Sequence, residues 1–137
     1  MIMGARVLLI EPDHLLGETI ANGLSDVGWQ VQRASTAQEA LNMADQTGLD
    51  LVICELQLVE HSGIEFLYEF KSYPEWQAVP VIIYSIVPPS EFSIHLNGLQ
   101  NNLGVEAYLY KPRTTLQQLN RTALGVLNKV RHEATKN

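Results

Sequence analysis

Three short apolar runs in this chain each end abruptly at charged or polar side chains. The run at residues 51–54, Leu-Val-Ile-Cys, is followed directly by Glu55. Runs at residues 7–10 and 107–110 end in the same way. Unbroken apolar runs of this length are typical of parallel strands buried on both faces, and ligands of open α/β sheets bind beyond the carboxyl ends of such strands. The residues that we expect at this edge of the sheet are Glu55, Glu11, Pro12, Asp13, Lys111 and Pro112.

The remainder of the chain alternates between strand-like and helix-like patterns. Residues 29–34 alternate apolar and polar side chains, as a half-exposed edge strand does. Amphipathic helical stripes separate the strands, and parallel strands require such crossover helices. The pattern therefore predicts an α/β fold with a doubly wound, five-stranded parallel sheet and five helices on its two faces. The predicted strands are residues 6–10, 29–34, 51–54, 79–86 and 106–110.

Capping residues mark the predicted ends of the helices. Thr36 with Glu39 three residues later forms a capping box for the second helix, and Gly48 is placed to close it. The last helix carries an apolar stripe that ends at Val130. The other predicted boundaries are Asp13 and Gly28 for the first helix, Gly63 and Pro74 for the third, Pro88-Pro89 and Gly104 around a fourth helix at 91–103, and Thr114 or Thr115 for the last.

Length, charge and cysteine content restrict the class of protein. The 137 residues suit one domain, with a core at 6–131 and a polar tail at 132–137. The net charge of −6 argues against direct nucleic-acid binding, which needs clustered Lys and Arg. The single cysteine, Cys54, forms no internal disulfide and is expected in the core. Without a signal peptide or an apolar run long enough for a bilayer, we expect a cytoplasmic protein without membrane contact.

Four motifs, in order and at suitable spacing, resemble the receiver domain of bacterial two-component response regulators. They are VLLIEPD, DLVICELQLVEHSGIEFL, VPVIIYS and GVEAYLYKP. The resemblance covers the chain from Val7 to about Val130. It implies a role in phosphorelay signal transduction and the receiver strand order 2-1-3-4-5.

The resemblance also assigns roles to individual residues. A typical receiver accepts a phosphoryl group on an aspartate at the end of its third strand, where this chain has Glu55. The acidic pair that coordinates Mg²⁺ after the first strand is matched by Glu11 and Pro12. The remaining matches are Ser85 for the hydroxyl that bonds the phosphoryl group, Tyr108 for the aromatic residue that turns inward on activation, Lys111 for the phosphoryl-contacting lysine, and Pro112 for a proline that often follows a cis bond.

Two substitutions separate this chain from a typical receiver. Glu55 is one methylene longer than aspartate, and a misplacement of roughly 1 Å costs an in-line transfer about a hundredfold in rate. Pro12 offers no side-chain ligand, whereas Mg²⁺ requires a near-octahedral shell held by few carboxylates. Asp13, one residue further, either replaces the missing ligand or caps the first helix. We therefore expect no metal and no cofactor, with Glu11 and Asp13 as the only candidate ligands.

Two functions of different class follow. In the first, Glu55 pairs with Lys111 and Ser85 and fixes the domain in one state, so that it acts without phosphorylation and without enzymatic activity. Its partner is then a histidine kinase, an output protein or a scaffold, bound at the family's usual face of fourth helix, fifth strand and last helix; pairing of two copies there is an open alternative. In the second, Glu55 still accepts phosphate, with Mg²⁺ held by Glu11 and Asp13.

Overall fold

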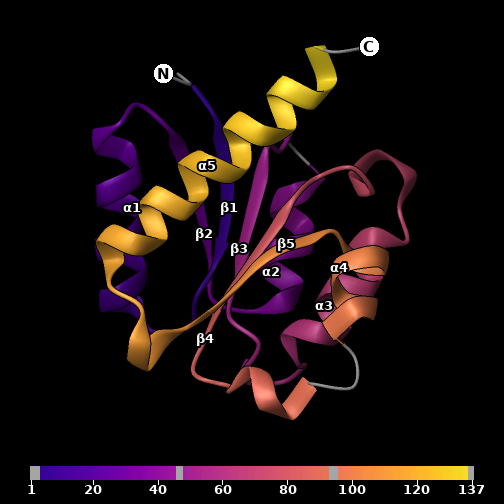
Figure 1. Ribbon diagram of the computed structural model, residues 1–137. Coiled ribbons are helices and arrows are strands. Elements are labelled where there is room, and N and C mark those ends of the chain that lie inside the picture. Colours follow the sequence, from indigo (N-terminus) through magenta and orange to yellow (C-terminus); the bar gives the residue numbers. More distant parts are fainter. Residues whose placement is uncertain (1–3, 46–47, 93–95, 136–137) are drawn as a thin grey trace.

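The computed structural model describes residues 4–45, 48–92 and 96–135 and contains a five-stranded parallel sheet in the order β2-β1-β3-β4-β5 (Figure 1). This fold class and strand order confirm the sequence prediction. The strands are β1 (Arg6–Ile10), β2 (Gln30–Ala34), β3 (Leu51–Cys54), β4 (Val81–Ser85) and β5 (Val105–Tyr110). Each is parallel to its neighbours, and β4 and β5 pair with an irregularity between Val81 and Ile82.

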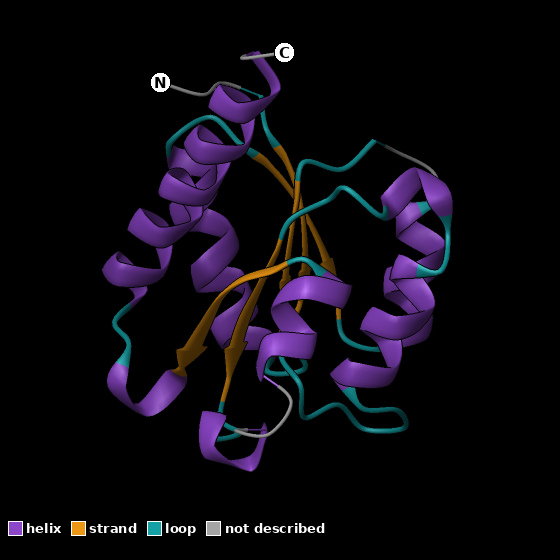
Figure 2. Ribbon diagram, turned by 45° about the vertical axis from the view of Figure 1, so that its right-hand side comes forward, coloured by secondary structure: helices purple, strands orange, loops and turns teal. Residues whose placement is uncertain are grey.

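Helices cover both faces of the sheet, as Figure 2 shows. Helices α1 (His14–Asp26) and α5 (Leu116–Thr135) pack on one face. Helices α2 (Ala37–Ala44), α3 (Gly63–Lys71) and α4 (Leu96–Leu103) pack on the other. Three short 3-10 turns, at Pro74–Trp76, Pro89–Phe92 and Lys111–Arg113, complete the connections within the described residues.

The central strands are apolar throughout because both of their faces are covered. Successive side chains of a strand point to opposite faces. In β3, Val52 and Cys54 therefore join the core under α2 and α3, whereas Leu51 and Ile53 join the core under α1 and α5. Cys54 is fully buried, as expected, and burial raises the pKa of its thiol. The edge strand β2 is only partly buried, in agreement with its alternating sequence.

Most predicted helix caps are present. The Asp13 carboxylate accepts a hydrogen bond from the Leu16 N–H at 3.0 Å, and the Thr36 hydroxyl accepts one from the Glu39 N–H at 3.1 Å. Gly28 adopts the left-handed conformation, with φ of 88°. At the start of α5, Thr115 and Gln118 exchange two side-chain to backbone hydrogen bonds, so Thr115 rather than Thr114 is the cap.

Several predicted boundaries differ from the structure. Strand β2 begins one residue later than predicted, β4 ends one residue earlier, and β5 begins one residue earlier. Helix α2 ends at Ala44, and Gly48 lacks the positive φ of a closing glycine. Strand β4 begins at Val81 because Pro80 has no N–H to donate. The stretch 91–103 does not form one helix, since a 3-10 turn ends at Phe92 before α4 begins; residues 93–95 lie outside the described part.

A further difference concerns the expected polar tail from His132. Helix α5 continues through this segment to Thr135, because polar helix formers extend an established helix without needing a core contact. Within the described part of the chain, none of the helices combines the length and the apolar character that a membrane span needs.

Candidate functional site

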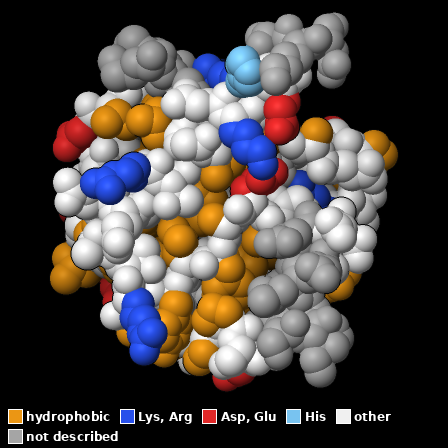
Figure 3. Space-filling model, viewed as in Figure 1, with side chains coloured by type: hydrophobic (Ala, Val, Ile, Leu, Met, Phe, Trp, Pro, Cys, Tyr) orange, Lys and Arg blue, Asp and Glu red, His pale blue; other side chains and the backbone are white. Residues whose placement is uncertain are grey.

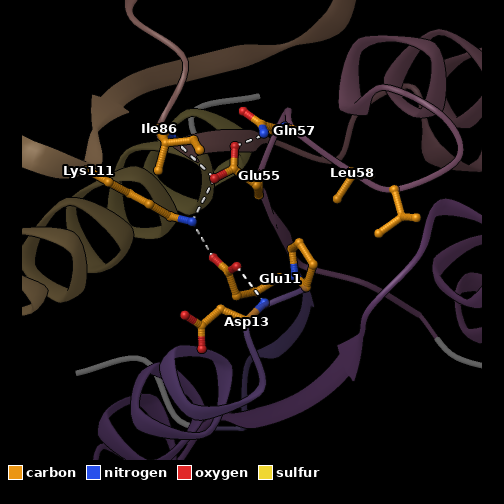
Figure 4. A pocket seen from close by; sticks show the side chains of 9 residues that line it. Glu11, Asp13, Glu55, Gln57, Leu58, Ile86 and Lys111 are labelled. Atoms are coloured by element: carbon orange, nitrogen blue, oxygen red, sulfur yellow. Dashed lines mark hydrogen bonds and ion pairs between the residues drawn. The ribbon is translucent and has the colours of Figure 1, made fainter.

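The carboxyl ends of β1, β3 and β5 bring Glu11, Glu55 and Lys111 together, as the strand pattern predicted (Figure 4). They line a pocket of about 380 Å³ at this edge of the sheet. Both carboxylate side chains are 3% exposed and the Lys111 side chain is 12% exposed. The further lining residues are Pro12, Asp13, Gln57, Leu58, Val59 and Ile86.

Lys111 joins the two carboxylates. Its Nζ lies 2.6 Å from Glu11 Oε1 and 2.6 Å from Glu55 Oε1. Burial raises the pKa of Glu55, but the Gln57 N–H and the contacts with Lys111 and Ser85 outweigh burial and hold that pKa below its ordinary value. Burial lowers the pKa of Lys111, but both carboxylates raise it and the net shift is upward. Both shifts favour the charged forms, so Glu55 and Lys111 form an ion pair at neutral pH.

Four donors surround the Glu55 carboxylate. Oε1 accepts from Lys111 Nζ and from the Ile86 N–H at 3.1 Å. Oε2 accepts from the Gln57 N–H at 3.0 Å and from the Ser85 hydroxyl. An ionised carboxylate has about four acceptor positions on its two oxygens. All four are filled, and the carboxylate is therefore locked in one orientation.

The predicted contacts of Glu55 with Lys111 and Ser85 are thus present, but sequence reasoning missed the two backbone donors. The Gln57 and Ile86 N–H groups reach Glu55 because of the backbone conformation of the β3–α3 and β4–α4 connections. The residue types at these two positions do not indicate that conformation. Gly63 fixes the first path, because a Cβ at this position would lie 2.5 Å from the Glu55 carbonyl oxygen. The Gly63 N–H also donates to the Leu56 carbonyl oxygen at 2.8 Å.

Glu11 and Asp13 have structural partners. The second oxygen of Glu11 accepts from the Asp13 N–H at 3.0 Å, which fixes the turn between β1 and α1. Asp13 is exposed and caps α1. Pro12 lines the pocket with a ring that offers no ligand atom.

The residues present do not fit the Mg²⁺ that the resemblance implies. Among the described residues, no group of three or more His, Cys, Asp or Glu side chains is placed to hold a metal ion. The ammonium of Lys111 already bridges Glu11 and Glu55, and Asp13 serves the helix cap. A hard cation would have to displace an ammonium that is bound to both carboxylates at 2.6 Å.

Hydrogen bonds connect the site to Tyr108. The Ser85 hydroxyl, which donates to Glu55, accepts from the Val87 N–H at 3.0 Å. The carbonyl oxygen of Val87 accepts from the Tyr108 hydroxyl at 2.7 Å. The Tyr108 ring is half-buried and packs against the core under α2 and α3. Burial, with contributions from Glu55 and Glu91, raises the pKa of Tyr108 to about 12, so its hydroxyl is a donor at physiological pH.

The bond before Pro112, which the resemblance made a candidate for the cis form, is trans. No cis peptide bond occurs in the part of the chain that the structure describes. Lys111–Arg113 forms a 3-10 turn, closed by a hydrogen bond from the Thr114 N–H to the Lys111 carbonyl oxygen at 3.2 Å. A trans proline early in a helical turn is accommodated because its fixed φ suits that conformation.

Comparison with known proteins settles the family. A family model described as the response regulator receiver domain matches residues 7–123. This chain belongs to that family. As a receiver domain, it takes part in two-component signal transduction.

Curated relatives are about one-third identical to this receiver domain over the aligned residues. The KDP operon transcriptional regulatory protein KdpE of Escherichia coli is 34% identical over 107 residues, which are 78% of this chain and 44% of KdpE. The transcriptional regulatory protein QseB of Haemophilus influenzae is 31% identical over 107 residues, which are 78% of this chain and 46% of QseB. The chain spans less than half the length of these relatives.

Solved structures show the same fold at lower identity. A CheY-like response regulator receiver domain protein of Methanospirillum hungatei superposes with a TM-score of 0.82 at 22% identity, covering 95% of this chain and 98% of that one. The chemotaxis protein CheY4 of Vibrio cholerae gives 0.77 at 21% identity, covering 90% and 98%. At these identities the likeness establishes the receiver fold.

Proposed function

We propose that this receiver domain is a signalling module that acts through protein–protein contacts, without enzymatic activity and without control by phosphorylation. In this proposal the Glu55 carboxylate takes the place of a phosphoryl group and holds the domain in one state. The observation that carries the proposal is the filled hydrogen-bond shell of Glu55, in which Lys111 and Ser85 are the two residues that the resemblance assigns to the phosphoryl group.

The same shell argues against Glu55 as a phosphoacceptor. A nucleophilic carboxylate needs a free lone pair directed at phosphorus along the line of attack. Each oxygen of Glu55 already accepts two hydrogen bonds. Attack would break at least one of them inside a buried site, where an unpaired donor costs about 1–3 kcal/mol.

The arrangement of Tyr108 favours the activated form as the fixed state. In the receiver family this aromatic residue turns inward on activation. Here the ring packs against the core, and its hydroxyl reaches the Val87 carbonyl at 2.7 Å. Because Val87 is bonded to Ser85, and Ser85 to Glu55, the carboxylate supports the inward ring through a continuous chain of hydrogen bonds.

The expected partner is a histidine kinase, an output protein or a scaffold, bound at the surface of α4, β5 and α5. The curated relatives are transcriptional regulators more than twice as long as the matched segment. By analogy with them, an output component that this receiver domain contacts directly is the first candidate.

Intact-mass spectrometry after incubation with acetyl phosphate and Mg²⁺ tests the proposal. A Glu55→Asp, Pro12→Asp double variant restores both missing family residues and serves as the positive control. We expect no added phosphoryl mass on the natural protein and a gain on the double variant.

A second candidate function has one observation in its favour. The pocket beside Glu55 has about 380 Å³ of free space, enough to admit a small phosphodonor. If the natural protein gains phosphoryl mass, and the gain disappears in Glu55→Gln, the domain is a working phosphoacceptor and the proposal of a fixed state is wrong.

A further inference from the structure

Charge is distributed unevenly along this acidic chain. Six of its nine Lys and Arg residues lie in residues 105–137, together with only two of its fifteen Asp and Glu residues. The preceding 104 residues therefore carry nearly all of the negative charge. Of the basic residues, Lys111 is bound to Glu11 and Glu55, and Lys129 lies 3.3 Å from Glu106. Within the described part of this segment, the other basic residues are Arg113, Arg121 and Arg131, and all three are exposed.

Arg113 and Arg121 are two such residues. Both are exposed, and within the described residues neither has an ion-pair partner. Figure 3 shows Lys and Arg side chains along α5, with hydrophobic side chains gathered beside the helix. Positive charge on an otherwise acidic protein attracts acidic partners and repels basic ones over about 10 Å at 0.1 M salt.

Grooves lie on both sides of this part of α5. The groove toward α1 has a volume of about 280 Å³, a floor of Leu24 and Trp29, and walls of Val27 and Leu124. Val27 is 47% exposed and Leu124 is 38% exposed, so the groove opens to solvent between apolar walls. Arg121 lies at its rim.

The second groove lies toward the end of β5 and has about 270 Å³. Leu109 lines it, and Thr114, Gln118 and Thr122 provide polar groups. Arg121 lines this groove as well, with Arg113 at the other side. Arg121 thus lies on a ridge between an apolar groove and a polar groove. We call Arg121, Leu124 and the two grooves the α5 face.

The size and chemistry of the α5 face indicate which class of ligand fits it. Each groove is smaller than the roughly 300 Å³ at which small-molecule sites begin, but large enough for a side chain. The apolar residues line a recess that has room for a partner's side chain, and they do not form a protruding surface of the kind that inserts into a bilayer. Acidic residues over the rest of the chain repel an extended polyanion such as DNA, whereas a short acidic segment can be confined to the ridge formed by Arg121 and Arg113.

We propose that the α5 face binds an acidic segment of a partner protein, with one large apolar side chain of that segment in the groove toward α1 and neighbouring carboxylates on Arg121 and Arg113. Arginine is suited to this role because its planar fork binds carboxylates through two parallel hydrogen bonds. The inference adds the chemistry of a partner to the proposed function and rests on its protein-binding part, but it uses no property of Glu55.

Titration with a synthetic peptide tests this inference. The peptide carries Leu and Phe among Glu and Asp residues, and its control has Gln and Asn in place of the acidic residues. Calorimetry measures the affinity, and amide chemical shifts locate the contact. We expect the acidic peptide to bind more tightly than its control, with shifts at Val27, Gln117, Arg121 and Leu124 and with weaker binding as salt increases.

Two charge-reversal variants make the test specific. Arg121→Glu should weaken binding of the acidic peptide by about tenfold, which corresponds to about 1.4 kcal/mol. Arg6→Glu makes the same change in net charge on the exposed start of β1, on the other side of the sheet from α5, and should leave the affinity nearly unchanged. Both residues are exposed, so neither replacement threatens the fold.

Several results would overturn the inference. These are equal binding of the acidic and neutral peptides, equal effects of the two variants, or shifts that map away from α5. Self-association of the free protein that Leu124→Ser abolishes would show that a second copy covers this face. None of these results bears on the phosphoryl mass measurement, so the two proposals fail independently.

Discussion

Lys111 Nζ lies 2.6 Å from Glu55 Oε1, which joins the end of β5 to the end of β3 across the intervening β4. The same nitrogen lies 2.6 Å from Glu11 Oε1 at the end of β1. The three groups are largely withdrawn from solvent, and breaking a buried pair by removing one partner costs more than the pair contributes as a whole. The cluster is therefore a structural link between the ends of three strands.

Glu55→Gln removes the charge and keeps the size of the side chain. Lys111 retains Glu11, so we expect a loss of about 2 kcal/mol in the free energy of unfolding, within the range for an unsatisfied buried partner. Urea denaturation at neutral pH measures it. Glu60→Gln makes the same exchange at an exposed position of the β3–α3 connection and should stay within about 0.5 kcal/mol of the natural protein. Equal losses would show that the Glu55 contacts contribute nothing measurable.

The contribution of Glu55 to stability should depend on pH in a defined direction. Its pKa is lowered on folding, so the contribution is fully present above the unfolded-state pKa of about 4.3 and is lost as pH falls through the lower, folded-state value. The stability difference between the natural protein and Glu55→Gln should then shrink as the solution becomes acidic. Urea denaturation at a series of pH values measures this, and a difference that grows toward acid would contradict the assignment.

The opposite dependence holds for Lys111, whose pKa is raised on folding. Its contribution is fully present below the unfolded-state pKa of about 10.4 and is lost as pH rises through the folded-state value. At moderately alkaline pH the ion pair should therefore still stabilise the fold.

Tyr108→Phe removes the hydroxyl that donates to Val87. The ring packs against the core, so we expect it to stay in place and the protein to lose about 1 kcal/mol of stability. Tyr110→Phe, two residues along β5, provides the matched control and should change stability by less than about 0.5 kcal/mol. If Tyr108→Phe is as stable as the natural protein, the hydrogen-bonded chain from Glu55 does not reach this residue.

Gly63→Ala should disturb the path that places the Gln57 N–H. A Cβ there would lie 2.5 Å from the Glu55 carbonyl oxygen and 2.7 Å from Leu56 Cα, and both are backbone atoms. We expect a loss of about 1–3 kcal/mol from overpacking. Gly125→Ala, in open space within α5, should instead stabilise the protein by up to about 1 kcal/mol. Thermal unfolding of the two variants gives opposite shifts in this account.

The position of the site was predictable because it depends on strand ends. Apolar runs identify buried parallel strands, and their carboxyl ends share one edge of the sheet, which places Glu11, Glu55 and Lys111 together. The caps at Asp13 and Thr36 were predictable for a similar reason, since each depends on side-chain chemistry within three residues.

Features that depend on the path of the backbone were not predictable. The Ile86 N–H reaches Glu55 because the chain turns after β4, and the residue types there do not predict that turn.

Lys71 gives a second example. As the last residue of α3 it looks like an exposed partner for the helix dipole, yet it is 7% exposed and donates to the carbonyl oxygens of Trp76, Gln77 and Val79. The conformation of the loop that supplies these acceptors cannot be predicted from the periodicity of apolar residues.

In the proposed fixed state, the Glu55 carboxylate takes the phosphoryl position and the Lys111 ammonium takes the place of a cation. Amide chemical shifts of the natural protein, recorded before and after addition of Mg²⁺ and then acetyl phosphate, test it most directly. We expect unchanged signals for Gln57, Ile86 and Tyr108, whereas the Glu55→Asp, Pro12→Asp variant should respond at these positions. A saturable response of the natural protein at Gln57 and Ile86 would contradict the claim, because it would show that the site still binds its ligands.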